Sequence, residues 1–205
     1  MRSVRAAWLC MRMLCGAAAI AGCASTSTPA RFHTLLPPTG DSVVARVHAA
    51  PAVRVEVLPV TLPVQVDVAQ IVVRLPDDSM RALEHERWIA PLADEIRSAL
   101  ALRIDAALVA SAAPTAAVSG APWRVALQVQ RFDSTLGGGA GLQAVWSLEQ
   151  PGGGPGLRCQ VNDREAVAAS PVALVAGHRA IVERLGDAIG RAVGAAAAGA
   201  APACA

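Results

Sequence analysis

The sequence predicts a single α+β domain, in which an antiparallel or mixed sheet is covered by two main helices and is preceded by a lipoprotein signal peptide. Several segments alternate apolar and polar residues with the period of a half-buried strand, and two long segments repeat apolar residues at helical spacing. Loops rich in glycine and proline separate these segments. The 205-residue chain is long enough to form one domain with its own hydrophobic core.

The N-terminus has the features of a bacterial lipoprotein leader. Three arginines precede an uncharged run of apolar and small residues, and residues 20–23, Ile-Ala-Gly-Cys, have the form of a lipobox. This order is typical of a secretory signal, whereas a membrane-spanning helix needs about 20 apolar residues. We therefore predict a signal peptide at 1–22 and a lipidated tether at 23–30, with acyl chains such as palmitate on Cys23. An ordinary secretory signal that happens to precede a cysteine is the alternative.

Two features bear on the location and the partners of the mature protein, namely the residue after Cys23 and the net charge. In Gram-negative bacteria, Asp at that place usually retains a lipoprotein in the inner membrane, so Ala24 favours anchoring in the outer membrane, facing the periplasm. Without its leader the chain has 15 arginines, no lysine and 16 acidic residues, so its net charge is close to zero. A near-neutral surface without a basic cluster argues against a nucleic-acid partner.

Short strands are expected in the first half of the domain, which we place at 31–194. The strand candidates are 31–36, 53–58, 70–74 and 80–84, the last pairing back as the arm of a hairpin. Between the second and third, Pro59–Pro63 has a proline at each end. Because proline has no N–H to donate, this segment is expected to be an extended connector rather than an inner strand.

The first helix is expected from about Pro91 to Val109. A proline suits the first turn, where its missing N–H would have no partner. The apolar stripe of this helix consists of Leu92, Ile96, Leu100, Ile104 and Leu108. This spacing predicts one buried face, with Asp94 and Glu95 among the charged residues that lie off it.

An antiparallel meander is expected in the second half of the domain. Alternating segments at 123–132, 141–149 and 157–161 are joined by glycine-rich loops, which we place at 133–139 and 151–156. In the first two segments the apolar positions include Val125, Leu127, Trp146 and Leu148, and these should face the core.

The last helix is expected to begin at Ser170, as its N-cap, and Pro171. Its apolar stripe consists of Leu174, His178, Ile181, Leu185, Ile189 and Val193. Three glycines at 186, 190 and 194 follow another line along this helix, although an interior glycine costs about 1 kcal/mol relative to alanine. They either allow another backbone to approach closely or are simply tolerated. Residues 195–205 are rich in alanine and are predicted to form a disordered tail.

Two cysteines remain once the leader is removed and Cys23 is lipidated. Cys159 and Cys204 can form a disulfide in an oxidising compartment. A buried thiol at Cys159 with an unpaired Cys204 is the alternative, and the sequence does not decide between them.

The sequence shows no set of residues that points to catalysis, a metal or a cofactor. No two of the four histidines have the spacing that places metal ligands on one helix face, and His178 is expected to be a packed histidine at the core edge. Ser134 is not in the turn that exposes a serine nucleophile, and Asp77 and Asp78 are in what resembles a solvated turn. The glycine loops lack the Gly-Lys-Ser/Thr of a phosphate-binding loop. An enzyme is therefore the minority hypothesis.

A set of ordered motifs resembles the PqiC (YmbA) family of ABC-type transport auxiliary lipoproteins. The motifs are the lipobox, an aromatic-containing first strand at 31–36, Pro59–Pro63, Asp67, Gln70–Arg74, Arg87–Leu92, Phe132 and Trp146. The resemblance extends over nearly the whole mature chain. The sequence departs from the family pattern in having Val-Gln-Val at 64–66 and no Tyr, which bears on surface contacts more than on the fold.

The resemblance implies a periplasmic domain that acts with an MCE-domain protein and an inner-membrane transport component in envelope lipid trafficking, and that assembles into a homo-oligomeric ring. The expected partner interface consists of Thr61, Leu62, Pro63, Arg74, Arg87 and Trp88. For these residues a purely structural role, shaping a loop and capping a helix, is the alternative. The competing function is a general envelope lipoprotein that binds a ligand or stabilises another envelope assembly.

Overall fold

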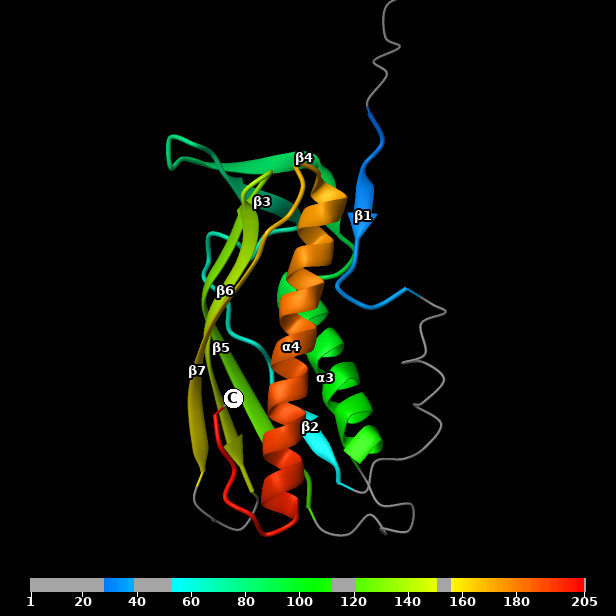
Figure 1. Ribbon diagram of the computed structural model, residues 1–205. Helices are drawn as coiled ribbons and strands as arrows, with labels where there is room; N and C mark the ends of the chain where they lie inside the picture. The colour runs from blue at the N-terminus through cyan, green and yellow to red at the C-terminus, as the bar shows by residue number, and fades with distance from the viewer. Residues whose placement is uncertain (1–27, 39–52, 112–120, 151–155, 205) are drawn as a thin grey trace, which may run out of the picture.

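The computed structural model describes residues 28–38, 53–111, 121–150 and 156–204. The predicted signal peptide and the predicted lipidation site, Cys23, lie outside these ranges. The elements are β1 (Arg31–His33), β2 (Val55–Val57), β3 (Gln70–Arg74), β4 (Met80–Trp88), α3 (Leu92–Ser111), β5 (Trp123–Thr135), β6 (Gly139–Glu149), β7 (Leu157–Glu165) and α4 (Pro171–Ala197). Together they form the α+β architecture that the sequence predicts (Figure 1).

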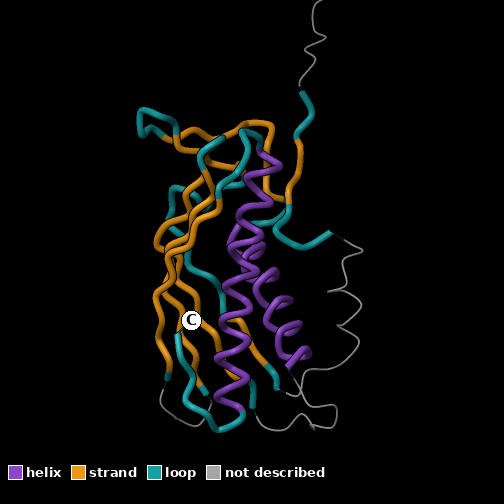
Figure 2. The backbone as a smooth tube through the Cα atoms, in the orientation of Figure 1, coloured by secondary structure: helices purple, strands orange, loops and turns teal. Residues whose placement is uncertain are grey.

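The strands form two mixed sheets. The larger sheet has the order β2-β5-β6-β7, in which β5, β6 and β7 are the predicted antiparallel meander and β2 pairs with β5 in parallel. The smaller sheet has the order β1-β4-β3, with β1 parallel and β3 antiparallel to β4. The smaller sheet lies at one end of the molecule, and the two helices lie side by side along the larger sheet (Figures 1 and 2).

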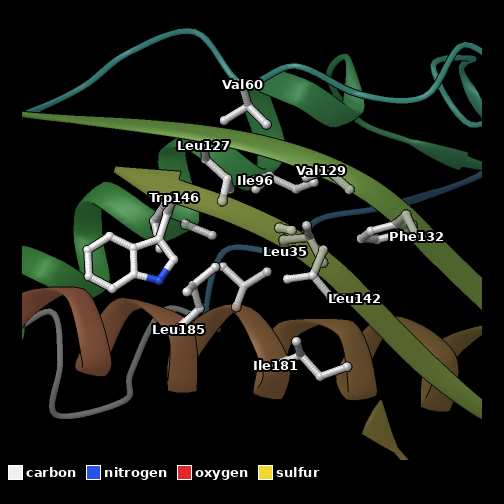
Figure 3. Close-up of a cluster of buried hydrophobic side chains, with 14 of the residues drawn as sticks. Leu35, Val60, Ile96, Leu127, Val129, Phe132, Leu142, Trp146, Ile181 and Leu185 are labelled. Carbon is white, nitrogen blue, oxygen red and sulfur yellow. The ribbon is translucent and has the colours of Figure 1, made fainter. Parts of the chain in front are cut away.

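The hydrophobic core lies between the larger sheet and the two helices (Figure 3). Every residue of the two predicted helix stripes is at most 4% exposed, which confirms both stripes. From the sheet, Leu127, Leu142 and Trp146 point toward Leu185 of α4 and Ile96 of α3. The first helix begins one residue later than predicted, since Pro91 lies just outside it and its carbonyl accepts from the amides of Asp94 and Glu95.

The glycines of α4 allow a close contact within this chain. A Cβ atom at Gly186 would lie 2.7 Å from the Arg103 side chain, and one at Gly190 would lie 2.7 Å from the Cβ of Ala107. Both neighbours belong to α3, so these two glycines let the two helices approach closely. The Nε and Nη2 atoms of Arg103 donate to the two carboxylate oxygens of Asp187, at 2.8 and 2.7 Å, beside this contact.

The Ala-rich C-terminal segment belongs to the fold. Helix α4 continues to Ala197, and a disulfide joins Cys204 to Cys159 of β7, with 5.6 Å between their Cα atoms. The expectation of a disordered tail from residue 195 is therefore wrong for residues 195–204. Alanine is the best helix former, and the disulfide holds the residues that follow the helix.

Two buried polar contacts connect distant parts of the chain. Glu95 of α3 is 4% exposed, and its carboxylate accepts from the Thr34 hydroxyl at 2.7 Å and the Leu35 amide at 2.8 Å. Arg179 of α4 donates to the carbonyl oxygens of the same two residues. The segment after β1 is thereby held by both helices. Glu95 lies off the apolar stripe, as predicted, but it is buried because this segment supplies its partners.

Candidate functional site

The residues predicted to form one partner interface are split between three places. Trp88 is 4% exposed and packs edge-on against Phe132, with 6.4 Å between ring centroids. It is a core residue, and its prediction as an interface residue is wrong, because alternation along β4 turns it inward. Arg87, next to it, is half-buried on the opposite face of the smaller sheet. Its Nε donates to the Glu84 carbonyl.

The connector Pro59–Pro63 is extended, as predicted, and runs beside β5. The Thr61 amide donates to the Leu127 carbonyl at 3.2 Å, and the Val129 amide donates to the Thr61 carbonyl at 2.9 Å. Thr61 is exposed, while Leu62 and Pro63 are half-buried. This segment therefore leads the chain along β5 toward β3.

Pro63 and Arg74 line the same depression, next to Asp133 of β5. Two adjoining depressions, of about 450 and 100 Å³, share Arg74, Arg131 and Asp133, and we call them together the Asp133 cleft. The larger depression is also lined by Asp78, Arg164, Glu165 and the glycines at 138, 139 and 141. The smaller is also lined by Pro63, Gln65, Val66, Met80 and Phe132.

The cleft exists because the side chains of β5 that point into the core change partway along the strand. Val125, Leu127 and Val129 point into the core, but after a register shift between Val129 and Arg131 the buried residues are Phe132 and Ser134. A bulge inserts one extra residue into a strand and thereby reverses which side chains face the core. Arg131 and Asp133 are consequently on the outer face. The predicted loop at 133–139 is shorter than expected, because β5 continues to Thr135 and β6 begins at Gly139.

Asp133 is the electrostatic centre of the cleft. Its two carboxylate oxygens are paired with different guanidinium groups, Arg74 at 3.2 Å and Arg131 at 3.1 Å. The Arg74 side chain is about one-third exposed, the Asp133 side chain about one-quarter, and the Arg131 side chain about half. Arg164, across the larger depression, makes no ion pair with any described residue. The cleft therefore presents partly exposed charges of both signs.

The lining of the cleft is rich in charged side chains. Its lining holds arginines, carboxylates, glycines and apolar side chains, and no cysteine or histidine. In the parts of the chain that the structure describes, no group of three His, Cys, Asp or Glu side chains is arranged to hold a metal ion. Asp77, in the turn before β4, accepts from the Ser79 hydroxyl and amide, and these hydrogen bonds lower the pKa of its carboxyl.

A serine and a histidine form a buried pair beneath the cleft. Ser134 Oγ lies 2.8 Å from His178 Nε2, and each residue is 1% exposed. The His178 ring stacks on Phe132, with 3.8 Å between centroids. Desolvation lowers the pKa of His178 to about 3, so the ring is neutral at neutral pH. With both residues enclosed, His178 is a packed histidine, as the sequence predicts.

Sequence reasoning did not identify Arg131 and Asp133. Arg131 was expected inside a strand and Asp133 at the start of a loop. A signal for them exists, since Gln130 and Arg131 are two successive polar residues where the alternation of β5 should place an apolar one. This break marks the bulge that turns both side chains outward.

Comparison with known proteins connects this architecture to a family. A family model described as "ABC-type transport auxiliary lipoprotein component" matches residues 33–190. One similar solved structure is the crystal structure of an uncharacterized protein. It has a TM-score of 0.63 at 13% sequence identity, and the match covers 81% of this chain and 99% of the other. Another, protein XCC0632 from Xanthomonas campestris, has a TM-score of 0.53 at 16% identity and covers 82% and 92%.

No curated protein matches the sequence. Among the described residues, neither helix has the length and apolar character required to cross a bilayer. The two structural similarities concern the fold, and the family model covers well over half of the chain. On that match, the protein belongs to the family of ABC-type transport auxiliary lipoprotein components.

Proposed function

We propose that this protein is an outer-membrane-anchored periplasmic lipoprotein that acts as a non-enzymatic docking component of an MCE/ABC-type lipid transport system. Lipid on Cys23 would fix the domain to the membrane, because two or more acyl chains give a stable anchor. Its partners would be an MCE-domain protein and the inner-membrane transport component, and several copies would form a ring. Membership of a transport-auxiliary lipoprotein family supports this proposal.

The Asp133 cleft is the observation that carries a docking role. Docking surfaces are rich in arginine, and complementary charges set which partner binds and in which register. Here two arginines hold one carboxylate in place, and Arg164 faces the same depression without an ionic partner among the described residues. Met80, which is 40% exposed, and Pro63 add apolar surface beside these charges. A charged segment of a partner protein would fit this arrangement.

Crosslinked capture from membranes tests the proposal. The full-length lipoprotein is crosslinked in cells and purified, and the proteins captured with it are identified by mass spectrometry. We expect an MCE-domain protein among them. Replacing Asp133 by Arg should lower its recovery about tenfold, because like charges then meet in the cleft.

A matched control is available in the exposed ion pair between Glu56 and Arg124, 3.2 Å apart on β2 and β5. Glu56→Arg makes the same charge change outside the cleft and should leave capture unchanged. Recovery of the lipoprotein alone, or with unrelated envelope machinery such as a lipopolysaccharide or pilus assembly, would contradict the transport role. That result would favour the general envelope lipoprotein instead.

A further inference from the structure

The outer face of the smaller sheet carries two large apolar side chains in the open. Phe32 of β1 is 60% exposed, and Ile89, directly after β4, is 62% exposed. Phe32 is paired with Arg87, and the Ile89 amide donates to the His33 carbonyl at 2.9 Å, so the three residues are neighbours. Since side chains alternate along a strand, Phe32, Arg87 and Ile89 share one face, opposite the buried Trp88.

This surface is fixed with respect to the rest of the domain. The segment after β1 is bonded to both helices, through Glu95 and Arg179. On the inner face of the same sheet, His33 Nε2 is paired with Glu86 at 2.5 Å. Phe32 therefore cannot turn inward without breaking buried contacts, and its exposure is built into the fold.

The same surface is close in sequence to the lipid anchor. Cys23 precedes Arg31 by only eight residues. Eight residues reach at most about 27 Å when fully extended, and a flexible chain of that length spans on average about 16 Å. With the proposed acyl chains of Cys23 in the bilayer, the start of β1 lies at most about 27 Å from the membrane surface.

We propose that the face around Phe32, Arg87 and Ile89 lies on the bilayer surface and forms a second membrane contact beside the lipid on Cys23. The inference rests on the proposed function only for that lipid. Aromatic and aliphatic side chains suit the boundary between headgroups and acyl chains. Arg87 can place its apolar stem along this boundary and its guanidinium at the lipid phosphates.

This contact would also set the orientation of the domain. A lipidated tether alone leaves the domain free to turn, whereas a rigid face with two apolar side chains holds one surface to the membrane. The Asp133 cleft is lined by residues of β3, β5, β6 and β7, by Met80 at the start of β4 and by the segment after β2. It shares none of the three residues of the proposed face. Membrane contact and partner docking would thus use separate surfaces.

Photocrosslinking in lipid vesicles tests the inference without any partner. The full-length lipoprotein, purified from membranes, is reconstituted into vesicles of phosphatidylethanolamine and phosphatidylglycerol. A benzophenone amino acid replaces Phe32, Ile89 or, as the control, Val64. Val64 is apolar and 86% exposed, but it lies directly after the connector, between Pro63 and Gln65, which line the Asp133 cleft. Circular dichroism and an intact disulfide establish that each variant is folded.

We expect lipid adducts at positions 32 and 89 at about ten times the yield at position 64, as between a membrane-facing and a water-facing side chain. Equal yields at all three positions would overturn the inference, as would adducts at 32 or 89 with a second copy of the protein instead of lipid. In either case the partner-capture experiment stands, because it does not depend on this face. A chain that does not float with the vesicles would contradict both the membrane contact and the lipid anchor.

Discussion

Two regions of this protein differ in what they expose: the helix-covered body, and the smaller sheet with its adjoining cleft. In the body, β5, β6 and β7 pack on α3 and α4, and the core side chains are almost fully buried. At the other end, β1, β3 and β4 also bury side chains such as Ile71 and Trp88, but they leave Phe32, Ile89 and the charges around Asp133 at the surface. Apolar packing therefore stabilises both regions, and the exposed apolar and charged groups of the second region suit it to binding.

The largest expected effect is the loss of stability on replacing Trp88, which should far exceed the loss on replacing its neighbour Arg87. Trp88→Ala should lower the free energy of unfolding by about 3–5 kcal/mol, because it opens a cavity against Phe132. Arg87→Ala, on the outer face, should change it by less than about 1 kcal/mol. Denaturant unfolding of both variants measures this difference. Equal losses of stability would contradict the placement of Trp88 in the core and of Arg87 on the outer face.

Removing the disulfide should have the next largest effect. Replacing Cys159 and Cys204 together by Ser should lower the free energy of unfolding by about 2–4 kcal/mol, since the bond closes a loop over 45 positions of sequence. Thermal unfolding of oxidised wild type, reduced wild type and the double variant measures the loss. The reduced wild type should resemble the variant, and unchanged stability in both would contradict a disulfide in the folded protein.

Replacing a helical glycine by alanine usually stabilises a protein, but the close contact between α3 and α4 predicts the opposite for Gly190. Gly190→Ala should gain up to about 1 kcal/mol from helix propensity. We expect a net loss of about 1–2 kcal/mol instead, because the new Cβ would meet the Cβ of Ala107 at 2.7 Å. The reverse exchange, Ala176→Gly at an exposed position of α4, should cost only the propensity term. A stabilised Gly190→Ala protein would show that the helices are further apart.

The effect that is smallest at neutral pH is a dependence of stability on pH, caused by His178. Its pKa is lowered by burial to about 3, while in the unfolded chain it is 6.5. Below pH 6.5 the unfolded state binds a proton that the folded state does not, so stability decreases as the pH falls from 6.5 toward 3. The contribution is at most about 1.4 kcal/mol per pH unit.

In a His178→Gln variant this position binds no proton in either state. Its free energy of unfolding should therefore depend less steeply on pH between pH 7 and pH 5. Comparing the slopes of the two proteins cancels the contribution of the other histidines. Parallel slopes would contradict a neutral, enclosed His178.

The comparison of the two regions also explains what could be predicted from the sequence. The meander, both helix stripes and the Ser170 N-cap, whose hydroxyl accepts from the Ala173 amide, follow from local patterns that packing reinforces. Trp88 and Glu95 could not be assigned in this way. Each is buried because of a partner 44 or more residues away, namely Phe132 for Trp88 and Thr34 for Glu95.

The candidate site was less predictable than the fold for a physical reason. Pro63 and Arg74 were named from the sequence, but the carboxylate that joins them in one cleft comes from β5. Asp133 faces outward only because a bulge displaces the alternation of that strand by one residue. A register shift of this kind depends on pairing with β6, which local sequence does not show. The close packing of Gly186 and Gly190 on α3 likewise needed the structure.

The most direct test of the docking role is crosslinked capture from membranes by wild type and Asp133→Arg, with Glu56→Arg as the control. We predict that wild type and the control recover an MCE-domain protein equally, and that Asp133→Arg recovers about one-tenth as much while remaining folded and membrane-bound. The absence of such a protein from the wild-type sample would contradict the docking role in lipid transport. Equal recovery by all three proteins would instead place the docking surface away from the Asp133 cleft.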